Sequence, residues 1–176
     1  MLVSAIALYA CLVIRPPAFP PADHAQERSV RRFVKNFYEW YIHDVIHSDR
    51  SDPAWTAVTE RPFSFSPQLR TLLREDAGDV RQIKPSFISL DFDPFLAGKD
   101  PDPRYVIGKV ERKGSSWYVR VSAVPYKDDP KVFATTAKVE KAKTKRGWRF
   151  TNFLYDGGKD LLTRLKELKR QRQGKR

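Results

Sequence analysis

The sequence has few of the residues that most chemical sites need, with one cysteine, three histidines and eight glycines in 176 residues. The single Cys11 excludes an intramolecular disulfide. The longest apolar run, Leu2–Ile14, has 13 residues, whereas a helix that spans a bilayer needs about 20. Glycine-rich phosphate loops, nucleophile elbows and paired CxxC cysteines are absent from the sequence. These absences exclude the most familiar nucleotide-binding, hydrolase and redox motifs.

Apolar and aromatic residues, by contrast, are plentiful. The composition is 41% hydrophobic and 12% aromatic, with 11 phenylalanines and four tryptophans. This is enough for one packed core, and 176 residues fit one domain of ordinary size. Thirteen prolines against eight glycines indicate stiff loops.

The first 29 residues indicate export. The length of Leu2–Ile14 fits the apolar core of a signal peptide, although almost no basic leader precedes it. Leu8–Cys11 is similar to a lipoprotein box, in which Cys11 would be lipidated, while cleavage after Ala25 is the alternative. A third interpretation, a buried first helix or strand, is disfavoured by the proline-rich Arg15–Pro21. We expect a signal peptide or lipoprotein leader over 1–14, a proline-rich tether over 15–29, and a periplasmic or membrane-anchored lipoprotein.

A long amphipathic helix is predicted from near Gln26 to His47. At about 100° per residue, one stripe gathers the residues expected to be buried, and these are Val30, Phe33, Val34, Phe37, Tyr41 and Val45. Tyr38 and Trp40 flank the stripe. We expect Phe37 to lie between this helix and a sheet, near Trp117 or Trp148.

The histidine pair His43 and His47, with Asp44 between, resembles the H-E-x-x-H helix of zinc peptidases. The helical angles place both histidines on the solvent side and Asp44 toward the buried side. The third histidine, His24, falls in the predicted tether, whereas a catalytic zinc needs three protein ligands. We therefore expect surface histidines, no metal site and no cofactor.

The middle of the chain is predicted to be mainly loop. Asp49–Pro67 has three prolines and many polar residues, and Ser66-Pro67 then begins a helix that ends near Gly78. Asp91, Asp93 and Asp100 belong to an acidic stretch whose spacing does not match an EF-hand loop. We interpret these aspartates as caps of turns, with an ion site as the alternative.

From residue 105 the apolar period changes from 3.6 to 2. Four strands are predicted in succession, at Tyr105–Glu111, Trp117–Tyr126, Val132–Lys141 and Trp148–Tyr155. A leucine stripe then predicts a basic C-terminal helix over Lys159–Gln173. The expected fold is α+β, with a long N-terminal helix packed on a curved antiparallel sheet.

Three short motifs rich in aromatic residues stand out, and they are Phe37–Tyr41 (FYEWY), Phe92–Leu96 followed by Lys99-Asp100, and Gly147–Phe153. Together they resemble the DUF3828 family of exported bacterial proteins, which more often has Gln-Asp in place of Lys99-Asp100. The resemblance covers about residues 30–158. It implies an NTF2-like (cystatin-like) cone, in which the first helix packs into a strongly curved sheet. Residues 159–176 lie outside the resemblance.

The function that we expect is a non-catalytic binding module of the cell envelope. The resemblance also implies an alternative, a periplasmic immunity protein against an amidase toxin of type VI secretion. A third hypothesis is an enzyme, or a small-molecule binder, that uses a pocket inside the cone. The pocket candidates are Tyr38, Tyr41, Asp91, Asp93, Asp100 and Tyr118.

The formal net charge of +12 is concentrated in two stretches, with +5 over residues 138–149 and +6 over residues 159–176. Such stretches fit an acidic envelope protein or an anionic membrane surface, or they simply keep the chain soluble. Nucleic acid is disfavoured as a partner, because no aromatic residues alternate with these charges. The residues predicted to form the basic surface are Lys141, Lys143, Lys145, Arg146, Arg164, Lys169, Arg170 and Arg172.

Overall fold

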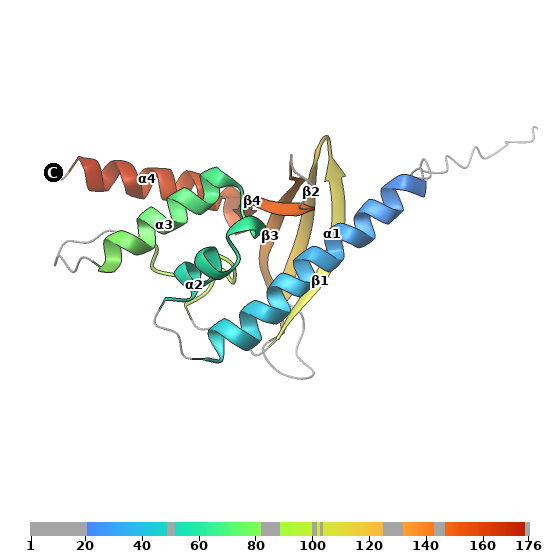
Figure 1. The fold of residues 1–176 in the computed structure, drawn as a ribbon, viewed down its shortest axis with the longest axis horizontal. Coiled ribbons are helices and arrows are strands. Elements are labelled where there is room, and N and C mark those ends of the chain that lie inside the picture. The colour runs from blue at the N-terminus through green and yellow to red at the C-terminus, as the bar shows by residue number, and fades with distance from the viewer. Residues whose placement is uncertain are drawn as a thin grey trace, which may run out of the picture.

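The structure is a computed structural model that describes residues 21–48, 52–81, 89–99, 102, 104–124, 132–142 and 147–174. The described residues form an α+β fold (Figure 1), as the sequence predicts. The helices are α1 (Pro21–Trp40), η1 (Tyr41–Ile46), α2 (Pro53–Glu60), η2 (Pro62–Ser64), α3 (Pro67–Arg81), η3 (Asp156–Gly158) and α4 (Leu161–Gln173). The strands are β1 (Tyr105–Lys113), β2 (Ser116–Ala123), β3 (Val132–Lys141) and β4 (Trp148–Leu154). Within these residues, no helix is long and apolar enough to cross a membrane.

The four strands pair in chain order, β1-β2-β3-β4, and every pair is antiparallel. The predicted meander is therefore confirmed, with strand ends within a few residues of those expected. Because side chains alternate along a strand, Trp117, Val119 and Val121 face the core, while Tyr118 and Arg120 face the other side of the sheet. This order leaves β1 and β4 as the two edges.

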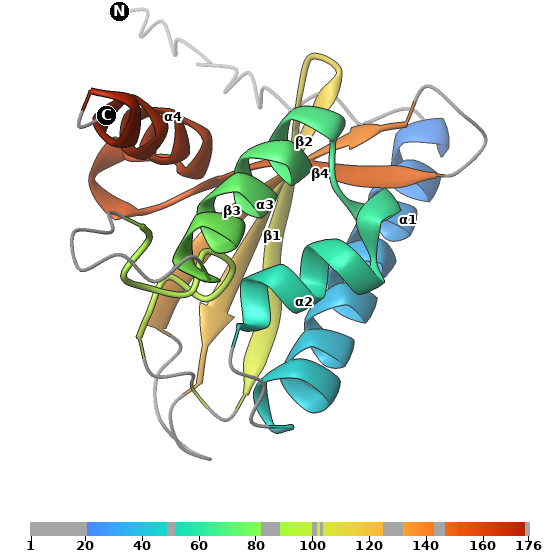
Figure 2. The ribbon, with the colours of Figure 1, turned by 60° about the vertical axis from the view of Figure 1, so that its left-hand side comes forward.

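Helix α1 runs across the sheet at the β1 side, α3 and α4 lie at the β4 side, and α2 lies between α3 and η1 (Figures 1 and 2). The buried stripe of the first helix is the predicted one, with Val30, Val34, Phe37 and Tyr41 almost fully enclosed. Phe37 lies between α1 and the sheet, as expected. However, its ring packs at 4.8–5.7 Å from Phe65, Phe95 and Phe150 instead of near Trp117 or Trp148.

The predicted tether over 15–29 is wrong for its last nine residues, because α1 begins at Pro21. Proline is tolerated in the first turn of a helix, where its missing N–H would have no partner. The early turns of α1 are also held by the sheet. Asp23 forms an ion pair with Arg112, and the Trp148 indole donates to the Ser29 hydroxyl at 2.9 Å.

The last turns of the first helix are wider than the sequence analysis assumed. Tyr41–Ile46 is a π-helical turn, η1, so the step of 100° per residue fails at this point. Asp44 is exposed, not turned toward the core, and accepts a 2.6 Å hydrogen bond from Nδ1 of His43. Both histidines are exposed, as predicted.

The loop predicted over Asp49–Pro67 is also partly wrong, because α2 forms within it. The Asp52 carboxylate accepts a hydrogen bond from the backbone N–H of Trp55, and Pro53 occupies the first helical position. This is the same pattern of cap and proline that correctly predicted the start of α3 at Ser66-Pro67.

Candidate functional site

Three of the predicted pocket residues come together beneath α1. The Tyr41 hydroxyl donates to Oδ2 of Asp93 at 2.5 Å, and the Tyr38 hydroxyl donates to the carbonyl oxygen of Phe95 at 2.7 Å. Tyr155, at the end of β4, donates to the carbonyl oxygen of Pro94 at 2.8 Å. Three tyrosines, from α1, from η1 and from the residue that follows β4, thus hold the segment 93–95 against the core.

Asp93 caps a turn, as the sequence analysis proposed. Its Oδ1 accepts from the backbone N–H groups of Phe95, at 2.8 Å, and Leu96, at 3.0 Å. Burial raises the pKa of Asp93 from 3.8 to about 6, although its hydrogen bonds act in the opposite direction. Burial likewise raises the pKa values of Tyr38 and Tyr41 well above 10.

The other predicted pocket residues do not join this group. Asp91 is exposed and lies 3.9 Å from Nζ of Lys99. Tyr118 is on the opposite face of the sheet, where Nζ of Lys113 lies 5.3 Å from the centre of its ring. Asp100 lies outside the described residues. The six candidates therefore do not form one site.

The space between α1 and the sheet is filled by aromatic side chains. Phe37 stacks on Tyr41 at 5.5 Å and meets Phe95 and Phe150 edge-on at 5.4 and 4.8 Å. Phe153 of β4 extends the cluster, at 5.1 Å from both Phe95 and Phe150. These rings occupy the volume that an internal ligand pocket would need between helix and sheet.

A surface groove of about 750 Å³ instead lies between the C-terminal half of the first helix and strand β1. Ile42, Tyr38 and Trp40 form its helical wall, and Tyr105, Val106 and Ile107 form the strand wall. Its charged and histidine residues are Arg31, Lys35, Glu39, His43, Asp44, His47 and Arg104. The π-turn η1 contributes Ile42, His43 and Asp44, and π-helical turns are frequent at functional sites.

The strand wall is the outer edge of the sheet. Just before β1 begins, the carbonyl of Arg104 accepts a hydrogen bond from the backbone N–H of Val124. In an antiparallel pair, the backbone groups of successive residues point alternately toward and away from the partner strand. Those of Val106 therefore point toward β2, and those of Tyr105 and Ile107 point away from it. In agreement with this alternation, the Ile107 carbonyl accepts a hydrogen bond from Arg31 of α1 at 3.3 Å.

Arg31 also bonds the carbonyl of Gly108 at 2.8 Å, and the register of β1 shifts between Ile107 and Val110. A guanidinium on two edge carbonyls and a bulge are common ways to block a sheet edge. Here they cover the edge from the Ile107 carbonyl onward to Val110. The part of the edge that faces the groove is therefore Tyr105–Ile107.

Two residues of the predicted basic surface form ion pairs within the protein. Lys169 lies 2.8 Å from a carboxylate oxygen of Glu75, and Arg172 lies 2.5 Å from Oδ1 of Asp76, so α4 is bound to α3 through two ion pairs. The predicted basic surface includes Lys169 and Arg172, and both take part in these internal ion pairs. A helix that docks through a leucine stripe also brings the charges beside that stripe against its neighbour.

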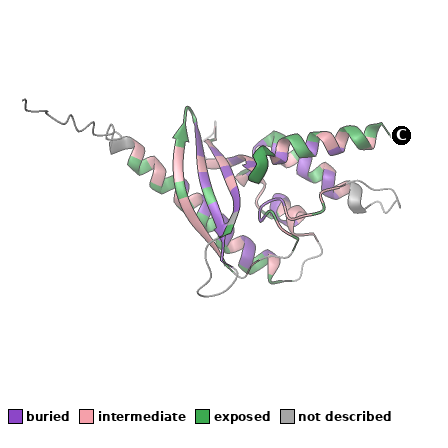
Figure 3. Cartoon of the chain, turned by 180° about the vertical axis from the view of Figure 1, so that it is seen from behind, coloured by how far each residue is buried: buried purple, intermediate pink, exposed green. Residues whose placement is uncertain are grey.

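The remaining predicted basic residues divide into two groups. Arg164, Arg170 and Lys141 are exposed, and Arg164 lies 4.0 Å from Glu167 on its own helix. Figure 3 shows that buried and exposed residues alternate along α4. Lys143, Lys145, Arg146 and the lipidation candidate Cys11 lie outside the described residues.

Among the described residues, no group of three or more His, Cys, Asp or Glu side chains could hold a metal ion. Comparisons with protein-family models, with curated proteins and with solved structures found no match. The resemblance to the DUF3828 family and the NTF2-like cone that it implies stay predictions.

Proposed function

We propose that this protein is a non-catalytic binding module of the bacterial cell envelope, and that an extended segment of a partner protein binds in the groove beside β1. The observation that carries the proposal is the position of the groove along Tyr105–Ile107 of the β1 edge, where the backbone groups of Tyr105 face outward and Arg31 of α1 bonds the carbonyl of Ile107. An extended peptide can add to such an edge as a further strand. The apolar run Leu2–Ile14 supports export, and the α1-on-sheet packing supports an NTF2-like fold.

The two walls of the groove suit such a segment. Strand addition uses backbone hydrogen bonds for affinity and pockets for alternate side chains for specificity. Tyr105 and Ile107 supply the backbone groups of the edge. Apolar side chains of the partner would pack against Trp40 and Ile42, which line the facing wall.

The charges of the groove favour an acidic partner. Arg31, Lys35 and Arg104 line it together with His43 and His47, against two carboxylates. Both of those carboxylates already have partners, since Glu39 pairs with Lys35 at 3.2 Å and Asp44 accepts from His43. With the histidines neutral, three cationic side chains against two carboxylates leave the groove with a net charge of +1. Electrostatic complementarity therefore selects segments that alternate apolar with acidic residues.

Selection of random displayed peptides on the immobilised protein would test this proposal. We expect sequences that alternate apolar and acidic residues. A selected peptide should bind the double variant Lys35→Glu, His47→Glu at least about tenfold more weakly than the wild type. Lys166→Glu with Gln171→Glu makes the same charge change on exposed positions of α4, and this control should stay within about twofold. Equal losses in both variants, or a loss in neither, would contradict the groove as the site.

A further inference from the structure

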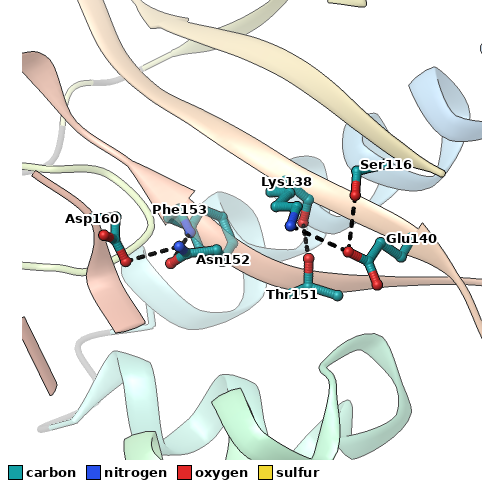
Figure 4. Close-up of polar contacts among 7 residues, drawn as sticks. All are labelled: Ser116, Lys138, Glu140, Thr151, Asn152, Phe153 and Asp160. Atoms are coloured by element: carbon teal, nitrogen blue, oxygen red, sulfur yellow. Dashed lines mark hydrogen bonds and ion pairs between the residues drawn. The ribbon is translucent and has the colours of Figure 1, made fainter. Parts of the chain in front are cut away.

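A second hollow, of about 430 Å³, lies at the other edge of the sheet, between the start of α3 and strands β3 and β4. Its lining includes Lys138 and Glu140 of β3, Arg149 and Thr151 of β4, and Gln68 of α3. Figure 4 shows Lys138, Glu140 and Thr151 lying together on the two neighbouring strands, whereas Asn152 points toward Asp160. This hollow is separate from the groove beside β1 and shares no residue with it.

Two cationic side chains of neighbouring strands line this hollow, with one carboxylate. Glu140 is opposite Arg149 in the β3–β4 register. It accepts a hydrogen bond from the Ser116 hydroxyl at 2.9 Å and lies 3.3 Å from Nζ of Lys138. The Glu140 carboxylate therefore already has two partners, one on β2 and one on β3. Lys138, Arg149 and Glu140 together give the hollow a net positive charge.

Arg149 is the unusual member of the group. Its Nε is buried and has no hydrogen-bond partner among the described residues. A buried donor without an acceptor costs about 1–3 kcal/mol, and such groups are rare in folded proteins. A guanidinium in this state is suited to an oxyanion, whose oxygens accept its N–H groups in a planar, two-point arrangement.

Two of the neutral residues that line the hollow can also interact with an anion. The Thr151 hydroxyl makes only a long 3.4 Å contact with the carbonyl of Lys138, so it can turn to donate to a ligand instead. The first turn of the 15-residue helix α3 also borders the hollow through Gln68, and a helix start favours negative charge. The described lining contains no aromatic side chain, which disfavours a stacked base or sugar.

We propose that this hollow binds a phosphate group, either as inorganic phosphate or as a phosphate monoester. Lys138 supplies a point charge, Arg149 supplies a planar pair of donors and Thr151 supplies a hydroxyl donor. The volume admits the phosphate and the part of a molecule next to it. A phosphate monoester and free phosphate share this chemistry, and the experiment below distinguishes them.

The test is a titration of the ¹⁵N-labelled full chain with sodium phosphate, sodium sulfate, glycerol 1-phosphate or sodium chloride at equal ionic strength. Phosphate should shift the backbone amide signals of Gln68 and Thr151 saturably, and chloride should not. Tighter binding of glycerol 1-phosphate than of phosphate would indicate a phosphate monoester, and the reverse order would indicate the free ion. A response to chloride equal to the response to phosphate would overturn the proposal.

Variants of the lining provide the second part of the test. Arg149→Met and Lys138→Met should each weaken phosphate binding at least about tenfold, as expected for a lost charge-assisted hydrogen bond. Lys166→Met, at an exposed position on α4, is the matched control and should bind as the wild type does. Thr151→Val keeps the shape of the side chain and should weaken binding less. If Lys138→Met and Thr151→Val both bind phosphate as the wild type does, the hollow is not the site, whether or not Arg149→Met folds.

Discussion

At the scale of single residues, Asp93 is the clearest case of a group whose role the structure decides. The sequence shows an aspartate before a proline, which is typical both of a turn cap and of an ion ligand. The structure favours the cap, through two backbone N–H groups and the Tyr41 hydroxyl. The sequence could predict this turn because a cap is local, but it could not predict Tyr41 as the partner, 52 positions away.

Asp93 should also set part of the pH dependence of stability. Its pKa in the folded protein is about 6, while an unfolded aspartate has a pKa of about 3.9. The folded chain therefore holds this proton to higher pH, so the contribution is full below about pH 4 and is lost as the pH rises through about 6. Urea unfolding should show that the stability of wild type relative to Asp93→Asn falls by about 2 kcal/mol between pH 4 and 7. A difference that stays flat, or that grows with pH, would mean that the pKa of this carboxyl is not raised.

At the scale of elements, the four strands, the start of α3 and the end of α4 were predictable, whereas the start of α1, helix α2 and the π-turn η1 were not. A period of two and a serine or aspartate before proline are local signals, which is why β3 and the start of α3 matched closely. The π-turn η1 has no such signal, because the sequence Tyr41–Ile46 fits an ordinary helix equally well. The groove was missed for this reason, since η1 forms part of its helical wall.

The docking of α4 on α3 could not be predicted from the sequence either, because it depends on residues about 95 positions apart. Asp76 is only 5% exposed, and burial raises its pKa, although Arg172 acts against this shift. Removing one member of a buried ion pair leaves the other charge without a partner. We expect Arg172→Leu to lower the free energy of unfolding by about 3 kcal/mol at pH 7, and by less near pH 4, where Asp76 would take up a proton.

The exposed neighbour Arg170→Leu is the control and should change stability by no more than about 0.5 kcal/mol. Urea unfolding of both variants at the two pH values would measure the difference. Similar small losses in both variants would mean that Arg172 does not hold α4 on α3. Truncation after Leu168 removes both ion pairs, so it should destabilise the domain as well as remove charge.

At the scale of the whole molecule, the filled space beneath α1 moves the search for a site to the surface. Hydrophobic patterning predicted which residues of α1 are buried, but it could not predict that aromatic rings fill the space between helix and sheet. The two hollows that we assign lie at opposite edges of the sheet, one beside β1 and one beside β4. Each is assembled from segments far apart in the sequence, and so neither has a motif.

The most direct test of the groove is amide hydrogen exchange of the protein with and without a selected peptide, followed by NMR. If the peptide adds as a strand, the backbone N–H groups of Tyr105 and Ile107, which face outward, should exchange at least about tenfold more slowly in the complex. The inward-facing N–H of Val106, which is already directed at β2, should change little. Saturating peptide that leaves Tyr105 and Ile107 unprotected, or that protects only α4, would contradict the proposal.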